Sequence, residues 1–187
     1  MMNTHHILRR QAGTSMIEVL VTMMILAVGL LGVAGLQTRL QMSEMEAYQR
    51  AQAMILVEDM ANRIAANRHL ASTYVTTSPI GTGSTCSTTA DANLKAMDQR
   101  EWCQALKGAG EKSGTSNVGT MIGGRGCVEV VSTNEYMVTV AWQGLGPLAP
   151  PPDGVACGAD QYDTENTPCV NDRCRRTVTT IIQIKPL

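Results

Sequence analysis

The sequence predicts an α+β fold, in which a long N-terminal α-helix packs on a small antiparallel β-sheet head with disulfide-pinned loops. Three observations support this prediction. Residues 14–70 have helical patterning with no proline. Three short β-branched runs follow residue 126, and all six cysteines lie after residue 70.

The first half of the predicted helix is long and apolar enough to span a membrane. Residues 19–36 carry no charged side chain. At a rise of about 1.5 Å per residue this run covers about 27 Å, close to the bilayer core of about 30 Å. Arg9 and Arg10 precede the run. This positive flank predicts a cytoplasmic N-terminus and an exported C-terminal part.

Glu18 is an unusual residue at the start of such a run. A carboxylate costs roughly 2.5 to 3.5 kcal/mol at mid-bilayer, and less near the interface, where it can reach the headgroups. A cut after Gly13 would make Glu18 the fifth residue and free an amine at Thr14. In a packed filament, the corresponding amine of a neighbouring subunit could pair with the carboxylate.

The segment GTSMIEVLVTMMILAVGLLGVAGLQ (13–37) resembles the class III signal of type IV prepilins. In that family a basic leader ends in glycine, a prepilin peptidase cuts after it, and the new amine is methylated. The resemblance therefore implies cleavage between Gly13 and Thr14, N-methylation of Thr14, and an assembly role for Glu18. Thr14 stands where major pilins usually carry Phe, and residues 29–37 look like the minor pilins called PilV. Gly29, Gly32 and Gly35 form a small-residue stripe within this segment.

The resemblance implies four parts. They are a cleaved basic prepilin leader (1–13), a transmembrane and assembly helix (14–36), an amphipathic helix (37–70) and a globular periplasmic head (71–187). The implied partners are the prepilin peptidase, other minor pilins, the major pilin, the inner-membrane assembly platform and membrane lipid. The implied location is the bacterial inner membrane and then the pilus fibre at the cell surface. The expected role is pilus assembly and priming near the tip, in support of twitching motility.

Apolar residues in the second half of the helix recur at spacings of three, four or seven. They predict a buried face made of Leu40, Ala47, Ala51, Met54, Ile55, Ala61, Ile64 and Ala65.

The head combines one short helix with three strands. Residues 91–107 predict a helix with Leu94, Met97, Trp102 and Leu106 on one side. Residues 127–132 and 136–142 predict a hairpin, and 177–184 a third strand. Both tryptophans, Trp102 and Trp142, are expected in the core.

An even number of cysteines on the exported side of a membrane segment predicts disulfides. The six candidates allow 15 pairings, which remain open: Cys86, Cys103, Cys127, Cys157, Cys169 and Cys174. Cys169 and Cys174, with Cys157 nearby, could instead ligate zinc, but an exported location favours disulfides.

Little else in the sequence indicates chemistry. The net charge of −1 and the lack of a long basic run argue against nucleic acid as a partner. The sequence supports no catalytic constellation and no cofactor. We therefore expect a protein that is not an enzyme and has no metal. The alternatives are a type II secretion pseudopilin, and an uncleaved, membrane-tethered domain that binds a ligand through its disulfide loop.

Overall fold

The computed structural model describes residues 13, 15–88, 93–110, 112–114, 116–117, 119 and 121–185. The predicted leader lies outside these residues except for Gly13, and so does Thr14. The chain divides into two compact units, residues 1–43 and 44–187. We describe each unit by itself.

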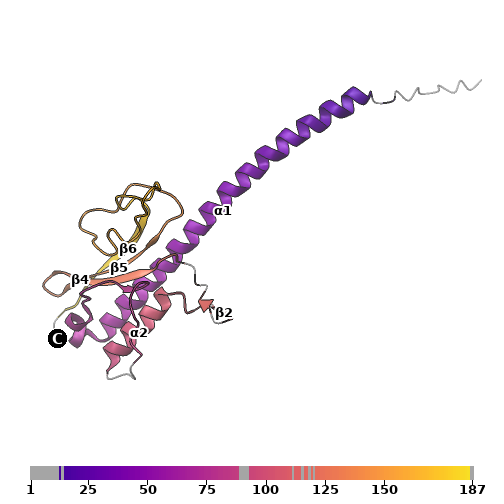
Figure 1. The fold of residues 1–187 in the computed structure, drawn as a ribbon. Helices are drawn as coiled ribbons and strands as arrows, with labels where there is room; N and C mark the ends of the chain where they lie inside the picture. The colour runs from indigo at the N-terminus through magenta and orange to yellow at the C-terminus, as the bar shows by residue number, and fades with distance from the viewer. Residues whose placement is uncertain are drawn as a thin grey trace, which may run out of the picture. The chain divides into compact units, whose positions relative to one another are not determined.

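Helix α1 (Met16–Ala66) begins in the first unit and continues into the second (Figure 1). It contains an 18-residue window with a mean hydropathy of 2.5, which is long and apolar enough to cross a membrane. The large apolar side chains of residues 16–36 are exposed to solvent, as in Leu20 (67%) and Leu31 (74%). A surface of this kind requires lipid or another protein to cover it.

The α-helix ends four residues earlier than the predicted boundary. Asn67 leaves helical geometry (φ −106°, ψ 41°), and the 3₁₀ helix η1 (Arg68–Tyr74) follows. The amide Nδ2 of Asn67 donates to the hydroxyl of Tyr74 at 2.9 Å. This bond gives Asn67 a polar partner in a non-helical conformation, which competes with continued helix.

The predicted antiparallel sheet is confirmed. It has four strands in the order β1-β4-β5-β6, and every pairing is antiparallel. The strands are β1 (Ile80–Gly81), β4 (Arg125–Ser132), β5 (Glu135–Gln143) and β6 (Arg175–Gln183). Strands β4 and β5 form the expected hairpin, whose turn places Asn134 at a φ of 61°, a conformation that asparagine tolerates. A separate two-stranded sheet pairs β2 (Lys112–Ser113) with β3 (Ser116–Asn117).

One face of the sheet packs on two helices. The second is α2 (Leu94–Leu106), whose N-cap residue Asn93 accepts the N–H of Ala96 at 2.9 Å. The buried cluster joins side chains from the second half of α1, from α2 and from the sheet, among them Val57, Met60, Ile64, Trp102, Leu106, Val128, Val138, Val140 and Trp142. Both tryptophans lie in this core, as expected.

The predicted buried face of α1 is largely wrong. Ala61 and Ile64 are buried, but Met54 and Ile55 are 44% and 58% exposed. The buried face consists of Gln49, Ala53, Val57, Met60, Ala61 and Ile64. Alanine, methionine and isoleucine occur on several sides of this helix, so spacing alone could not select the side that meets the sheet.

Leu94 of α2 is 50% exposed, whereas Trp102 and Leu106, predicted on the same side of that helix, are buried. It is the first residue of the helix, where the chain has only just reached the core.

The other face of the sheet is covered by the long loop of residues 144–174, opposite α2 (Figure 1). Successive strand residues point to opposite faces. Gly126 therefore faces Trp102, and Cys127 faces the loop, where it forms a disulfide with Cys157. A second small core forms here from Cys127, Ala141, Cys157 and Tyr162.

All six cysteines form disulfides, and the pairing that the sequence left open is now visible. The bonds are Cys86–Cys103, Cys127–Cys157 and Cys169–Cys174. The first ties the loop before α2 to that helix. The second fixes the long loop to β4, and the third closes a small ring at the end of the same loop.

We predict that the Cys127–Cys157 bond contributes most to stability. It closes a 30-residue separation, so removing it with Cys127→Ala/Cys157→Ala should cost about 3 to 4 kcal/mol in the chain-entropy model. The matched Cys169→Ala/Cys174→Ala variant opens a separation of five residues and should cost about 2 kcal/mol. Chemical unfolding of the full chain in detergent micelles measures both. Equal losses would contradict the prediction.

Candidate functional site

The candidate assembly site lies at the start of α1. Glu18 is in the first turn, where its N–H donates to the carbonyl of Ser15 at 3.0 Å. Its side chain is exposed, as are those of Met16 and Ile17. A carboxylate at this end of a helix also interacts favourably with the unpaired N–H groups of the first turn. Glu18 lies five residues after Gly13 in the sequence, and Thr14 lies outside the described residues.

The glycine stripe of the apolar segment leaves open space on the helix surface. A Cβ atom at Gly29, Gly32 or Gly35 would have no other atom within 4 Å. The helix passes through all three positions without interruption. No described residue requires glycine at these positions, so the stripe is available for close packing against another helix.

Within the second unit, a charged cluster joins α1 to α2. The Arg63 guanidinium lies 2.9 Å from the carboxylate of Asp98, 2.7 Å from Glu101 and 3.0 Å from Asp59. Asp98 is 5% exposed, and its other oxygen accepts the hydroxyl of Tyr74 at 2.5 Å. Burial lowers the pKa of Arg63, but the hydrogen bonds to Glu101, Asp59 and Asp98 outweigh it and raise that pKa. Arg63 therefore stays charged and neutralises the buried carboxylate.

Tyr74 makes the stability of this cluster sensitive to alkaline pH. Burial, followed by its hydrogen bond to Asp98, raises the pKa of Tyr74 above the ordinary value, and the bond from Asn67 opposes this shift. The neutral phenol is thus favoured in the folded state. Its contribution is fully present below the unfolded tyrosine pKa of about 10 and is lost as pH rises through the folded pKa.

We therefore predict that Tyr74→Phe flattens the alkaline loss of stability. The variant should be less stable than wild type by about 1 to 2 kcal/mol at neutral pH, because Asp98 loses a buried donor. Its free energy of unfolding should fall less steeply between about pH 10 and 11. Some dependence should remain, because burial also raises the pKa of Tyr162. If the free energies of unfolding of wild type and Tyr74→Phe fall equally steeply with pH in this range, Tyr74 is not the source of the alkaline loss.

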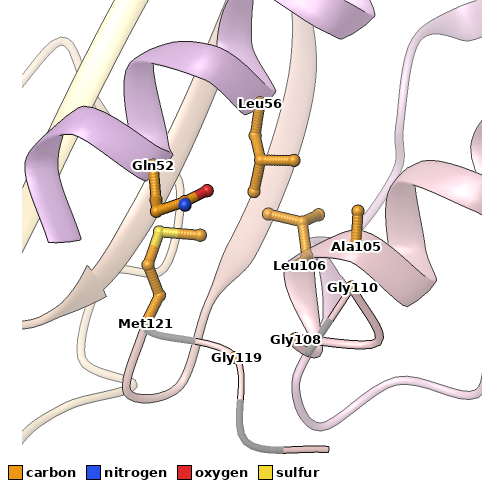
Figure 2. Close-up of a pocket in the computed structure, with 8 residues that line it drawn as sticks. All are labelled: Gln52, Leu56, Ala105, Leu106, Gly108, Gly110, Gly119 and Met121. Carbon is orange, nitrogen blue, oxygen red and sulfur yellow. The ribbon is translucent and has the colours of Figure 1, made fainter. Parts of the chain in front are cut away.

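The head also carries a groove of about 330 Å³ beside α1 (Figure 2). Gln52 and Leu56 of α1 face Met121 and Leu106 across it (Figure 2). The rest of the lining is Ala105, Gly108, Gly110 and Gly119. Gly108 and Gly119 approach so closely that a Cβ on Gly119 would lie 2.1 Å from the Cα of Gly108. None of the described lining residues is ionisable, so they offer this groove no acid, base or nucleophile.

Nor do the described residues assemble a site for metal chemistry. They contain no group of three or more histidine, cysteine, aspartate or glutamate side chains placed to hold a metal ion. The cysteines considered as zinc ligands, Cys157, Cys169 and Cys174, are all in disulfides.

Two family models match the chain, and their matches are contiguous. The model for the prokaryotic N-terminal methylation motif matches residues 8–34, and the model for type IV pilin Tt1218 matches residues 35–109. Residues 8–34 are thus similar to a prepilin methylation motif, and residues 35–109 to a type IV pilin domain. No significant match was found among curated proteins or among solved structures.

The two matches cover the features described above. The methylation motif covers Gly13, Glu18 and most of the apolar run, and the pilin match covers the Arg63–Asp98 cluster and α2. Type IV pilins are structural subunits. The family and the motif imply processing by prepilin peptidase, anchoring in a membrane and assembly with other pilins.

The sequence analysis did not identify the charged cluster around Arg63. Only the fold brings Asp98, 35 residues away, against Arg63.

Proposed function

We propose that this chain is a minor pilin that takes part in type IV pilus assembly and priming, at or near the pilus tip. The observation that carries the proposal is the contiguity of the two matches. A prepilin motif with Gly13 and Glu18 runs directly into a pilin domain along one helix, α1. A leader-anchored enzyme or binding domain would need no such helix.

In this proposal the prepilin is inserted with Arg9 and Arg10 in the cytoplasm and the head in the periplasm. Three disulfides in the head support an oxidising compartment. The peptidase cuts between Gly13 and Thr14, and Thr14 is methylated. Glu18 then pairs with the free amine of a neighbouring subunit, and the chain acts through contacts with other pilins rather than through catalysis.

The first test is the N-terminal residue and the mass of the membrane-extracted protein, with and without prepilin peptidase. The proposal expects a chain that begins at methylated Thr14 only when the peptidase is active. An intact leader in cells with active peptidase would overturn it, because the amine that pairs with Glu18 would not exist.

A deletion strain shows whether the chain serves the type IV pilus or the type II secretion pseudopilus, whose subunits share this kind of N-terminal helix. The minor pilin assignment expects loss of pili and twitching with normal protein secretion. Loss of type II secretion with normal pili would make the chain a pseudopilin instead. The run of residues 29–37 favours the pilus.

A further inference from the structure

The head sheet has one open edge. Strand β6 pairs with β5 alone. The N–H of Ile184 donates to Asn134, and the N–H of Gly144 donates to Cys174, both at 2.8 Å. These two bonds fix the alternation of the antiparallel ladder, so that even-numbered residues of β6 bond to β5. The N–H and C=O groups that point away from β5, and that bond to no described residue, belong to Thr177, Thr179, Ile181 and Gln183.

The opposite edge of the sheet is occupied along most of its length. Residues Ile80–Gly81 of β1 pair with the start of β4. Farther along β4, the N–H of Thr76 donates to the carbonyl of Val128 at 2.9 Å, and the N–H of Val128 donates to the Thr76 hydroxyl at 3.1 Å. Among the described residues of this edge, the chain thus pairs the backbone as far as Val128, whereas the β6 edge is open from Thr177 to Gln183.

The open edge lacks the features that usually prevent pairing. Natural edge strands carry charges, proline or bulges that block another strand. Residues 177–183 (TVTTIIQ) contain no charge, proline or glycine. Ile181 is 59% exposed on the outer face. Val178 and Ile182 pack against the core from the inner face but stay partly exposed. An added strand would complete their burial.

We propose that the β6 edge binds an extended strand of a different pilin-type subunit, which continues the head sheet by main-chain hydrogen bonds. This inference rests on the proposed function, because it needs a neighbouring subunit. The expected partner strand is uncharged at its centre and has carboxylates beside its ends. It spans the four outward-pointing residues of β6.

The charges around β6 argue against a second copy of this chain as the occupant. The copy's other edge is occupied from Arg125 to Val128, so its own β6 offers the longer open edge. A fully overlapping antiparallel β6 pair would place Arg175 and Arg176 of one copy beside Lys185 of the other. Like charges directly opposite are destabilising. Arg175 already pairs with Asp172 at 2.8 Å and Arg176 with Glu46 at 3.7 Å. Lys185 is exposed and pairs with no described residue, so in such a pair it would meet two arginines and no free carboxylate.

Proline substitutions at two adjacent positions test the edge. Thr179→Pro removes an N–H that points outward, so the head should fold and melt as in wild type. Its incorporation into filaments should fall by about tenfold, because a main-chain bond to the partner is lost. Thr180→Pro removes an N–H that bonds to β5 and should lower the melting temperature. A Thr179→Pro chain that folds and incorporates at the wild-type level overturns the proposal.

Hydrogen exchange keeps the test informative if Thr179→Pro does not fold. In the wild-type full chain in micelles, the amides of Thr179 and Ile181 should exchange faster than those of Thr180 and Ile182. In the assembled filament, the first two should exchange at least about tenfold more slowly, since a bonded amide exchanges only when it opens. Unchanged exchange at Thr179 and Ile181 overturns the proposal.

Photocrosslinking in cells that express the chain identifies the occupant. A benzophenone amino acid at position 181 should crosslink to an extended segment of a pilin-type subunit with a different sequence, and one at position 148, in the exposed loop, should not. A crosslink only to this chain's own β6, with dimers strengthened by Lys185→Glu, would overturn the choice of partner. If no crosslink forms although the wild-type chain is present in filaments, the proposal that the β6 edge binds a strand is overturned, and the proposed function is not. Absence of the wild-type chain from filaments would instead overturn the proposed function.

Discussion

Glu18→Ala is expected to remove the processed chain from filaments while leaving it stable in the membrane. If the carboxylate pairs with a neighbour's N-terminal amine in the apolar packing of helices, its loss leaves a buried charge without a partner. Breaking a pair of this kind costs about 3 to 5 kcal/mol. Such a loss lowers the equilibrium constant for incorporation by about two to four orders of magnitude. Immunoblots of sheared filaments, normalised to the membrane fraction, measure the ratio.

Two matched variants test whether the charge of Glu18 itself is required, or whether any carboxylate on this helix has the same effect. Glu44 is an exposed carboxylate on the same helix, so Glu44→Ala should leave incorporation unchanged. Glu18→Gln keeps the shape but loses the charge, and it should behave like Glu18→Ala. Cleavage after Gly13 should persist in all three. If Glu18→Ala chains enter filaments as wild type does, the carboxylate has no assembly role, even where the leader is removed.

The sequence predicts those features of the candidate site whose residues are neighbours in the chain. Gly13, Glu18 and the uncharged run that follows are recognised by their spacing, which needs no knowledge of the fold. Strands β4, β5 and β6 were also predictable, because alternation along a half-buried strand is a local signal. Their order in the sheet, which leaves the β6 edge open, is set by pairing between distant segments.

Features that depend on distant segments could not be predicted. Gln49 is 1% exposed on the buried face of α1, a position that its polarity argues against. Its oxygen Oε1 has no hydrogen-bond partner in the described part of the chain. The face that α1 buries is chosen by the sheet and by α2, and local spacing contained no signal for it. The same holds for the Arg63–Asp98 pair and for the pairing of the cysteines.

Trp102→Ala is expected to be the most destabilising single substitution in the head. Trp102 is fully buried between α1, α2 and the sheet, and its indole N–H donates to the carbonyl of Leu56 at 2.8 Å. Truncating a buried tryptophan to alanine costs about 3 to 5 kcal/mol. A small head with few aromatic residues has little stability in reserve. Far-UV circular dichroism during chemical unfolding of the full chain in micelles measures the loss.

The contact between Trp102 and Gly126 allows a test of whether the loss in Trp102→Ala comes from the indole that packs on the sheet. A Cβ on Gly126 would lie 2.4 Å from the indole atom Cη2, so Gly126→Ala alone should destabilise the head by about 1 to 3 kcal/mol through overpacking. With Trp102→Ala already present, the added methyl group enters the cavity and its clash with the indole disappears, which leaves a contact of 2.8 Å with the end of the flexible Leu106 side chain. The double variant should therefore be more stable than the sum of the single losses predicts, by at least about 1 kcal/mol. Additive losses would mean that the indole does not occupy the space over Gly126, and that α2 is held to the sheet by other contacts.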